Sequence, residues 1–202
     1  NDFLSLRSAN NNDAVASNGG NGNGGTITLN AEGNINTAGA NVFSFSNAGN
    51  GGDVAFTAGG NLNLNDVISN SPDGRGGTVT LSAEGLITAN NIETYSRRNA
   101  GDINIETTSS LNIEGNLSAD SEAGKGGNIN IATEGDASFG SISSYSSGRA
   151  RGGNITINSG GEIDVTNGSL GAYSSGANGG NVSLSAVGDI NTAAIETYSQ
   201  GR

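Results

Sequence analysis

A short segment with two glycines and two apolar residues returns at nearly constant spacing along the chain. Examples are GGTITLN at 24–30, GGTVTLS at 76–82 and GGNITIN at 152–158. The second position of this pair falls at 25, 52, 77, 101, 127, 153 and 180, so successive copies are 24 to 27 residues apart. A fixed period in this range is the signature of a solenoid, in which each repeat contacts only its neighbours.

Each copy begins a strand with one buried face. Residues two and four positions after the second glycine are apolar in every copy, as in Ile155 and Ile157, and the residues between them are mostly polar. This alternation predicts a β-strand. Position +8 is glycine in six of the seven copies, which indicates a bend where a side chain would clash or where φ is positive.

Two more strands follow in each repeat. Ile163 and Val165, at +10 and +12, are typical of a second strand, and Leu170 begins a third. No segment has apolar residues at helical spacing, and the many Asn and Gly residues are poor helix formers. Because Leu4 and Leu6 fit a second strand and Val15 a third, the chain opens in the middle of a repeat.

These patterns predict an all-β fold, a right-handed parallel β-helix (β-solenoid) with three short strands per triangular coil and about seven to eight coils. Residues 1–202 form a single solenoid, with coil boundaries near 25, 52, 77, 101, 127, 153 and 180. Each coil rises about 4.8 Å along the axis, the spacing of paired strands. We expect the 202 residues to be a section of a longer chain or a unit whose ends are covered by neighbours.

Composition excludes several classes of function. The chain has no Cys and no His, which removes disulfides, thiol catalysis and the usual zinc or haem ligands. Its net charge of −11 argues against nucleic acid as a partner, because phosphate binding needs basic patches. No apolar stretch approaches the roughly 20 residues that span a bilayer, so we predict no membrane insertion.

The third strand carries the most distinctive surface feature, an outward column of aromatic residues. The column is interrupted at Asn70 and Asp120, and two interpretations stay open. Exposed aromatic rings bind glycans or a partner surface, whereas rings stacked on one another stabilise neighbouring coils. The column consists of Phe45, Tyr95, Tyr145, Tyr173 and Tyr198.

A serine follows the start of every third strand by four residues and is expected to face inward. Its hydroxyl would bind either the next serine or a backbone carbonyl at the corner, which is a structural role. Without histidine, none of these serines has the usual base for nucleophilic catalysis. This serine ladder consists of Ser46, Ser71, Ser96, Ser121, Ser146, Ser174 and Ser199.

No catalytic, cofactor or metal site is predicted. A glycan hydrolase or lyase would need clustered carboxylates, but the acidic residues are scattered over exterior positions and bends, and the eight Lys and Arg residues lie mostly in corner loops. Incidental calcium at paired loop carboxylates stays open as an alternative. Ice binding by threonine columns is disfavoured because Asp53, Asp102 and Asn128 interrupt the one that contains Thr26 and Thr78.

The segment DFLSLRS at 2–8, followed by iterated GGNITIN…G.I and I.T.S..G..GG patterns, resembles the filamentous-haemagglutinin family over essentially the whole chain. Members are large bacterial exoproteins of two-partner secretion systems. The resemblance implies a right-handed parallel β-helix, export through an outer-membrane pore, and surface roles in adhesion, biofilm or extracellular fibres. The family's amino-terminal secretion domain is not visible in this sequence, and no binding residue carries over.

We therefore expect a non-enzymatic, extracellular rod of a secreted or cell-surface exoprotein, structural or adhesive, which builds a fibre by axial stacking. The alternative is an adhesin that binds glycan or a partner through the aromatic column. Expected partners are further copies joined end to end, or the continuing solenoid, together with surface glycans.

Overall fold

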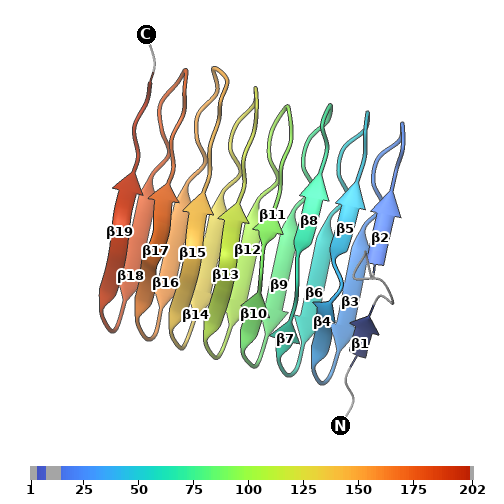
Figure 1. Ribbon diagram of the computed structural model, residues 1–202, viewed down its shortest axis with the longest axis vertical. Coiled ribbons are helices and arrows are strands. Elements are labelled where there is room, and N and C mark those ends of the chain that lie inside the picture. Colours follow the sequence, from blue (N-terminus) through green and yellow to red (C-terminus); the bar gives the residue numbers. More distant parts are fainter. Residues whose placement is uncertain (1–3, 8–14, 201–202) are drawn as a thin grey trace.

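The computed structural model describes residues 4–7 and 15–200, and in this part the chain is all-β with no helix (Figure 1). The predicted solenoid also included 1–3, 8–14 and 201–202, which lie outside the described residues. Every strand pairs in parallel with the equivalent strand one coil away. The chain is therefore a parallel β-helix, as predicted, and the coils lie side by side from β2 and β3 to β18 and β19.

The first strands of the coils form one sheet of seven strands. The register joins Ile27 to Val54 and continues through Val79, Ile103 and Ile129 in the steps that the glycine pairs predict. Its strands are β3 (Ile27–Ala31), β6 (Val54–Ala58), β9 (Val79–Ala83), β12 (Ile103–Thr107), β14 (Ile129–Thr133), β16 (Ile155–Ser159) and β18 (Val182–Ala186).

The second and third strands of each coil belong to one larger sheet. In the first coils they are separate. Their second strands are β1 (Leu4–Arg7), β4 (Ile35–Gly39), β7 (Leu62–Asn63) and β10 (Ile87–Ala89), and their third strands are β2 (Val15–Asn18), β5 (Val42–Phe45), β8 (Val67–Asn70) and β11 (Ile92–Glu93). From the fourth full coil onward the two merge into β13 (Leu111–Ser118), β15 (Ala137–Ser143), β17 (Ile163–Gly171) and β19 (Ile190–Glu196).

The sequence predicts a triangular coil of three short strands. In the later coils the second and third strands are continuous, because the backbone at the corner between them is still hydrogen-bonded to the neighbouring coil. The amide of Gly115 donates to Asn90 O, and the amide of Asn116 donates to Asn91 Oδ1. Pairing then resumes at Asn116 after a register shift, which bends the strand without ending it. The result is a coil with two principal sides rather than three equal ones.

The core is one thin aliphatic layer per coil. In the sixth full coil, Ile155, Ile157, Ile163, Val165 and Leu170 are all fully buried. Each such side chain contributes roughly 1.5–3 kcal/mol when it leaves water. The alternation of apolar and polar residues in the sequence therefore identified the inward face correctly.

The second glycine of each pair is required by axial packing. A Cβ at Gly52 would lie less than 3.0 Å from the carbonyl oxygen of Gly25, and one at Gly77 would overlap the carbonyl of Gly52 in the same way. The overlap recurs one coil later at Gly101, and at every later copy. From Gly52 onward, the second glycine recurs in every coil because the backbone carbonyl of the previous coil occupies the place that a Cβ would take.

The strands run between two different edges of the molecule (Figure 1). At the loop edge, seven protruding loops connect third strands to first strands, at residues 19–24, 46–51, 71–76, 96–100, 121–126, 146–152 and 174–179. At the opposite turn edge, tight turns connect first strands to second strands, at residues 32–34, 59–61, 84–86, 108–110, 134–136, 160–162 and 187–189.

Candidate functional site

The tyrosines of the predicted aromatic column stack along the solenoid axis. The ring centroids of Tyr145 and Tyr173 are 4.5 Å apart with planes inclined at 34°, and those of Tyr173 and Tyr198 are 5.2 Å apart at 16°. Tyr173 also lies over Gly171, where a Cβ would come within 2.7 Å of its ring. The faces of Tyr173 are thus occupied by its neighbours in the two adjacent coils.

This arrangement favours the stabilising interpretation over glycan binding. A sugar stacks on the face of an aromatic ring, and rings piled along the axis turn their edges, not their faces, toward a ligand that lies on the sheet. Aromatic pairs of this kind contribute about 0.5–1.5 kcal/mol each beyond their buried area. Phe45 follows the same logic inside its own coil, because it stacks on Phe43 at 5.7 Å.

The two interruptions of the column support it by hydrogen bonds. Asn70 Oδ1 accepts the backbone N–H of Tyr95 at 3.1 Å, and Asp120 Oδ1 accepts that of Tyr145 at 2.8 Å. The polar side chain therefore satisfies the amide of the tyrosine in the next coil. Sequence reasoning recorded these positions as gaps, although Asn and Asp are the residue types that reach a neighbouring N–H.

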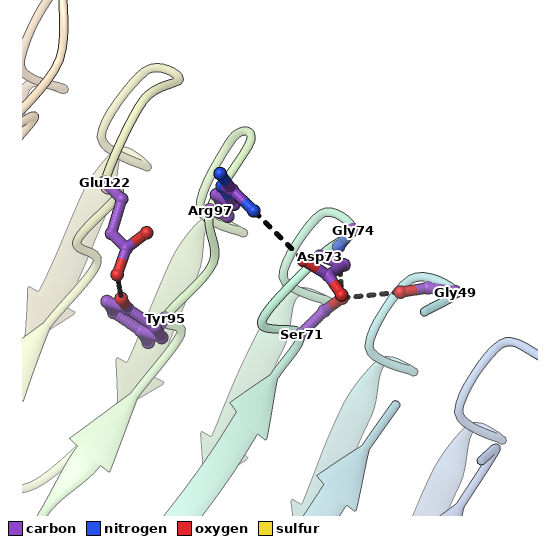
Figure 2. Close-up of polar contacts among 7 residues, drawn as sticks. All are labelled: Gly49, Ser71, Asp73, Gly74, Tyr95, Arg97 and Glu122. Atoms are coloured by element: carbon purple, nitrogen blue, oxygen red, sulfur yellow. Dashed lines mark hydrogen bonds and ion pairs between the residues drawn. The ribbon is translucent and has the colours of Figure 1, made fainter. Parts of the chain in front are cut away.

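Two tyrosine hydroxyls hold loops of the next coil. Tyr95 Oη donates to Glu122 Oε1 at 2.5 Å (Figure 2), and Tyr145 Oη is hydrogen-bonded to Ser175 Oγ. Desolvation, followed by the bond to Glu122, raises the pKa of Tyr95 to about 12. These contacts join the sheet face to the loop edge.

The serine ladder is buried from Ser46 to Ser174, whereas Ser199 in the end coil is exposed. Five of the six buried hydroxyls bind corner carbonyls rather than one another. Ser71 Oγ donates to Gly49 O at 2.5 Å and accepts the amide of Gly74 at 2.8 Å (Figure 2). Ser121 makes the equivalent pair of bonds, and Ser46, Ser146 and Ser174 donate to the preceding coil in the same way. Ser199, in the last coil, pairs with Ser174 through its backbone.

Ser96 differs from the other buried members of the ladder. Its hydroxyl is buried and has no hydrogen-bond partner in the structure. Its loop is one residue shorter, with five positions from Ser96 to Gly101 against six from Ser71 to Gly77. The short loop places no amide over the hydroxyl, so one buried polar group stays unsatisfied.

A second inward column, which the sequence analysis did not describe, binds the glycine pairs. Ser69 Oγ donates to Gly52 O at 2.8 Å and accepts the amide of Gly77 at 3.0 Å. Where the column holds alanine, the backbone replaces the hydroxyl, and Gly127 N donates to Ala119 O at 2.9 Å. The column includes Ser17, Ser44, Ser69, Thr94, Ala119, Ser144 and Ala172.

Three carboxylates interact across adjacent coils beside the tyrosines. Burial raises the pKa of Glu93, and the charges of Asp66 and Asp120 raise it further. Burial also raises the pKa of Asp120, although hydrogen bonds from the Ser143 hydroxyl and the Tyr145 amide oppose the shift. The sequence analysis treated the acidic residues as scattered and did not predict that these three interact.

The structure provides no cofactor or metal cradle around these carboxylates. Asp66 is already bound by the side-chain amides of Asn90 and Asn91, at 3.0 and 2.8 Å. Within residues 4–7 and 15–200, no three His, Cys, Asp or Glu side chains form a group able to hold a metal ion.

The loop edge carries the positive charge, as the sequence indicates. A groove of about 650 Å³ opens between successive loops and is lined by Arg75, Arg97 and Arg98, with Asp73 beside them. Arg97 Nη1 lies 3.3 Å from Asp73 Oδ1 (Figure 2), the one ion pair among the described residues. Both side chains are more than half exposed, and such pairs contribute about 0–1 kcal/mol.

The described part of the chain contains no helix that is long and apolar enough to span a membrane. Comparison with known proteins finds no matching family model, no matching curated protein and no matching solved structure. The geometry of the chain itself therefore shows what it is: a repeat protein with the fold of a parallel β-helix.

Proposed function

We propose that this chain is an extracellular structural rod, part of a secreted or cell-surface exoprotein, that displays or spaces other elements and extends into a fibre by axial stacking. The observation that carries the proposal is the use of conspicuous polar and aromatic side chains to join one coil to the next. Serines, asparagines and tyrosines all bond along the axis. The resemblance of the repeats to filamentous-haemagglutinin exoproteins supports a location outside the cell.

Axial stacking would act through the end coil, whose geometry identifies the side chains to test. Ile190 and Ile195 are 45% and 50% exposed, whereas their equivalents one coil earlier, Ile163 and Leu170, are fully buried. The free edges of β18 and β19 end the two sheets, and strand edges favour pairing with another chain. A further coil, from a second copy or a continuing solenoid, would cover both isoleucines and pair both edges.

The alternative function, adhesion through the aromatic column, has narrower support. Tyr198, with 41% of its surface exposed, is the most accessible ring of the column, and it belongs to the same uncovered end coil. A further coil that stacked on this end would cover Tyr198 as well. The geometry therefore favours the rod over a glycan platform.

The proposal is tested by blocking the end of the solenoid. The double substitution Ile190→Lys/Ile195→Lys places two charges where the next coil would pack, and Asn191→Lys/Glu196→Lys, on the outward face of the same strand, is the control. We expect light scattering and electron microscopy to show axial rods or fibres for the unchanged chain and the control, and single units for the end-blocked chain. A chain that stays monomeric at every concentration, with its ends uncovered, would contradict the axial proposal.

A further inference from the structure

The two edges of the solenoid carry opposite charge. The protruding loops carry six cations and two carboxylates, a net charge of +4, although the whole chain has a net charge of −11. Two more carboxylates, Asp53 and Asp102, lie at the bases of these loops, where each accepts a backbone N–H of the next coil. The cations occupy four consecutive coils and all are exposed. They are Arg75, Arg97, Arg98, Lys125, Arg149 and Arg151.

The turn edge has six carboxylates and no cation, a net charge of −6. All six side chains are exposed, and they extend from the first full coil to the last. They are Glu32, Glu84, Glu134, Asp136, Glu162 and Asp189. Figure 1 places these turns at the opposite side of the molecule from the protruding loops.

The loop-edge charges are available for a partner. Asp73 is paired with Arg97, and Glu122 accepts the hydroxyl of Tyr95. This leaves Arg75, Arg98 and the cations of the next two loops without an ion pair among the described residues. Since the protruding loops hold six cations and only two carboxylates, pairing within the loops cannot neutralise them.

We infer that parallel copies of this chain associate side by side, with the loop edge of one copy against the turn edge of the next. The two edges belong to the same solenoid, so their loops and turns repeat at the same pitch of about 4.8 Å per coil. Five of the seven turns and four consecutive loops carry the charges. A copy displaced sideways therefore meets complementary charge at several coils at once. Both edges are held by coil-to-coil hydrogen bonds, so little conformational freedom is lost on contact.

A second copy accounts for both edges, whereas an anionic polymer would account only for the loop edge. Because the contact joins two different surfaces, each added copy presents a fresh loop edge and a fresh turn edge. Heterologous contacts of this kind do not close, and they generate extended arrays. The inference goes beyond the proposed rod, since it concerns sheets of rods and does not depend on axial stacking.

The test uses charge reversal at one edge at a time. The loop-edge variant carries Arg75→Glu, Arg98→Glu, Arg149→Glu and Arg151→Glu, and the turn-edge variant carries Glu32→Lys, Glu84→Lys, Glu134→Lys and Glu162→Lys. None of these side chains makes a hydrogen bond or ion pair within the described structure, so both variants should fold, which circular dichroism verifies. Each variant then has two edges of like sign.

We expect the unchanged chain to associate in sedimentation velocity at about 0.02 M salt and to weaken at least tenfold at about 0.3 M, where charges are screened. Each reversed variant alone should lose this association, and an equimolar mixture of the two should recover it. The double variant Glu106→Lys/Glu114→Lys changes the net charge on other faces and should associate as before, whereas Glu84→Lys/Glu134→Lys, with the same change in net charge, should not.

Association that ignores salt and both reversals, or a mixture that fails to recover it, would overturn the inference. Failure of axial stacking is a separate result, because that contact depends on Ile190 and Ile195 at the end coil and not on the edge charges. An anionic polysaccharide that binds the loop edge while copies never associate would also overturn it, in favour of the polymer.

Discussion

Ser71 and Ser96 occupy the same buried column and differ in a single respect, which gives a matched experiment. Ser71 donates to Gly49 O and accepts Gly74 N–H, whereas the hydroxyl of Ser96 has no partner. Replacing Ser71 with alanine leaves a half-buried carbonyl and a buried amide without their bonds. Each unsatisfied group costs about 1–3 kcal/mol, so we expect Ser71→Ala to lower the free energy of unfolding by about 2–3 kcal/mol.

The same substitution at Ser96 should have the opposite tendency. It removes a buried hydroxyl that has no bond to lose, and burial of such a group is itself unfavourable. We expect Ser96→Ala to be neutral or to stabilise the chain by about 1 kcal/mol. The two variants should therefore differ by about 3 kcal/mol, although each loses one oxygen atom from the same column.

Urea unfolding followed by circular dichroism measures the difference, and hydrogen exchange localises it. The amide of Gly74 should exchange faster in Ser71→Ala, and distant coils should be unchanged because a solenoid transmits contacts only to its neighbours. Ser121→Ala, which loses the same two bonds, should reproduce the Ser71 result. Equal destabilisation at Ser71 and Ser96 would refute the reasoning.

Further predictions concern backbone packing, the core and the surface. Gly127→Ala should prevent native stacking, because its Cβ would overlap Gly101 O, whereas Gly22→Ala, with its nearest atom at 3.4 Å, should fold; thermal unfolding compares them. Ile155→Asp should unfold its coil in a proteolysis assay, since an unpaired charge would enter a dry core. Asp120→Asn should stabilise the chain at pH 7. Burial raises the native pKa of Asp120, so the carboxylate destabilises the fold above that pKa, and the advantage of the amide should disappear as pH falls below the ordinary value. We also expect no polysaccharide turnover; activity lost on replacement of one carboxylate would contradict that expectation.

The fold was predictable because a solenoid repeats its constraints. Seven copies of one pattern predicted the period, the inward face at Ile155 and Ile157, and the burial of the serine ladder from Ser46 to Ser174. The same copies left two explanations for the glycine at position +8, a clash that any side chain would make there or a positive φ. Among the described residues the only glycine with positive φ is Gly20, so close approach of neighbouring atoms, not φ, explains that position.

The candidate site was less predictable, because it depends on orientation rather than on pattern. The sequence predicts Tyr173 on the outer face. The stacking of its ring, however, depends on its rotamer and on the absence of a Cβ at Gly171, which leaves room for the ring. The merging of strands in the later coils depends on hydrogen bonds at a corner whose length varies. The hydroxyl of Ser96 has no partner because its loop is one residue shorter than most. The sequence contains this difference in length, but its effect on the hydroxyl can be seen only when the neighbouring coil is in place.

The uniform step of the ladders has a kinetic consequence. The strand pairings join residues about one coil apart, 24 to 28 residues in most coils and 31 to 32 between β1 and β4. The entropy of closing each coil is therefore nearly the same. The first two coils must form together with no template, which makes nucleation the slow step. Each later coil adds its strands to an edge that already exists, so we expect growth to advance one coil at a time from wherever it begins.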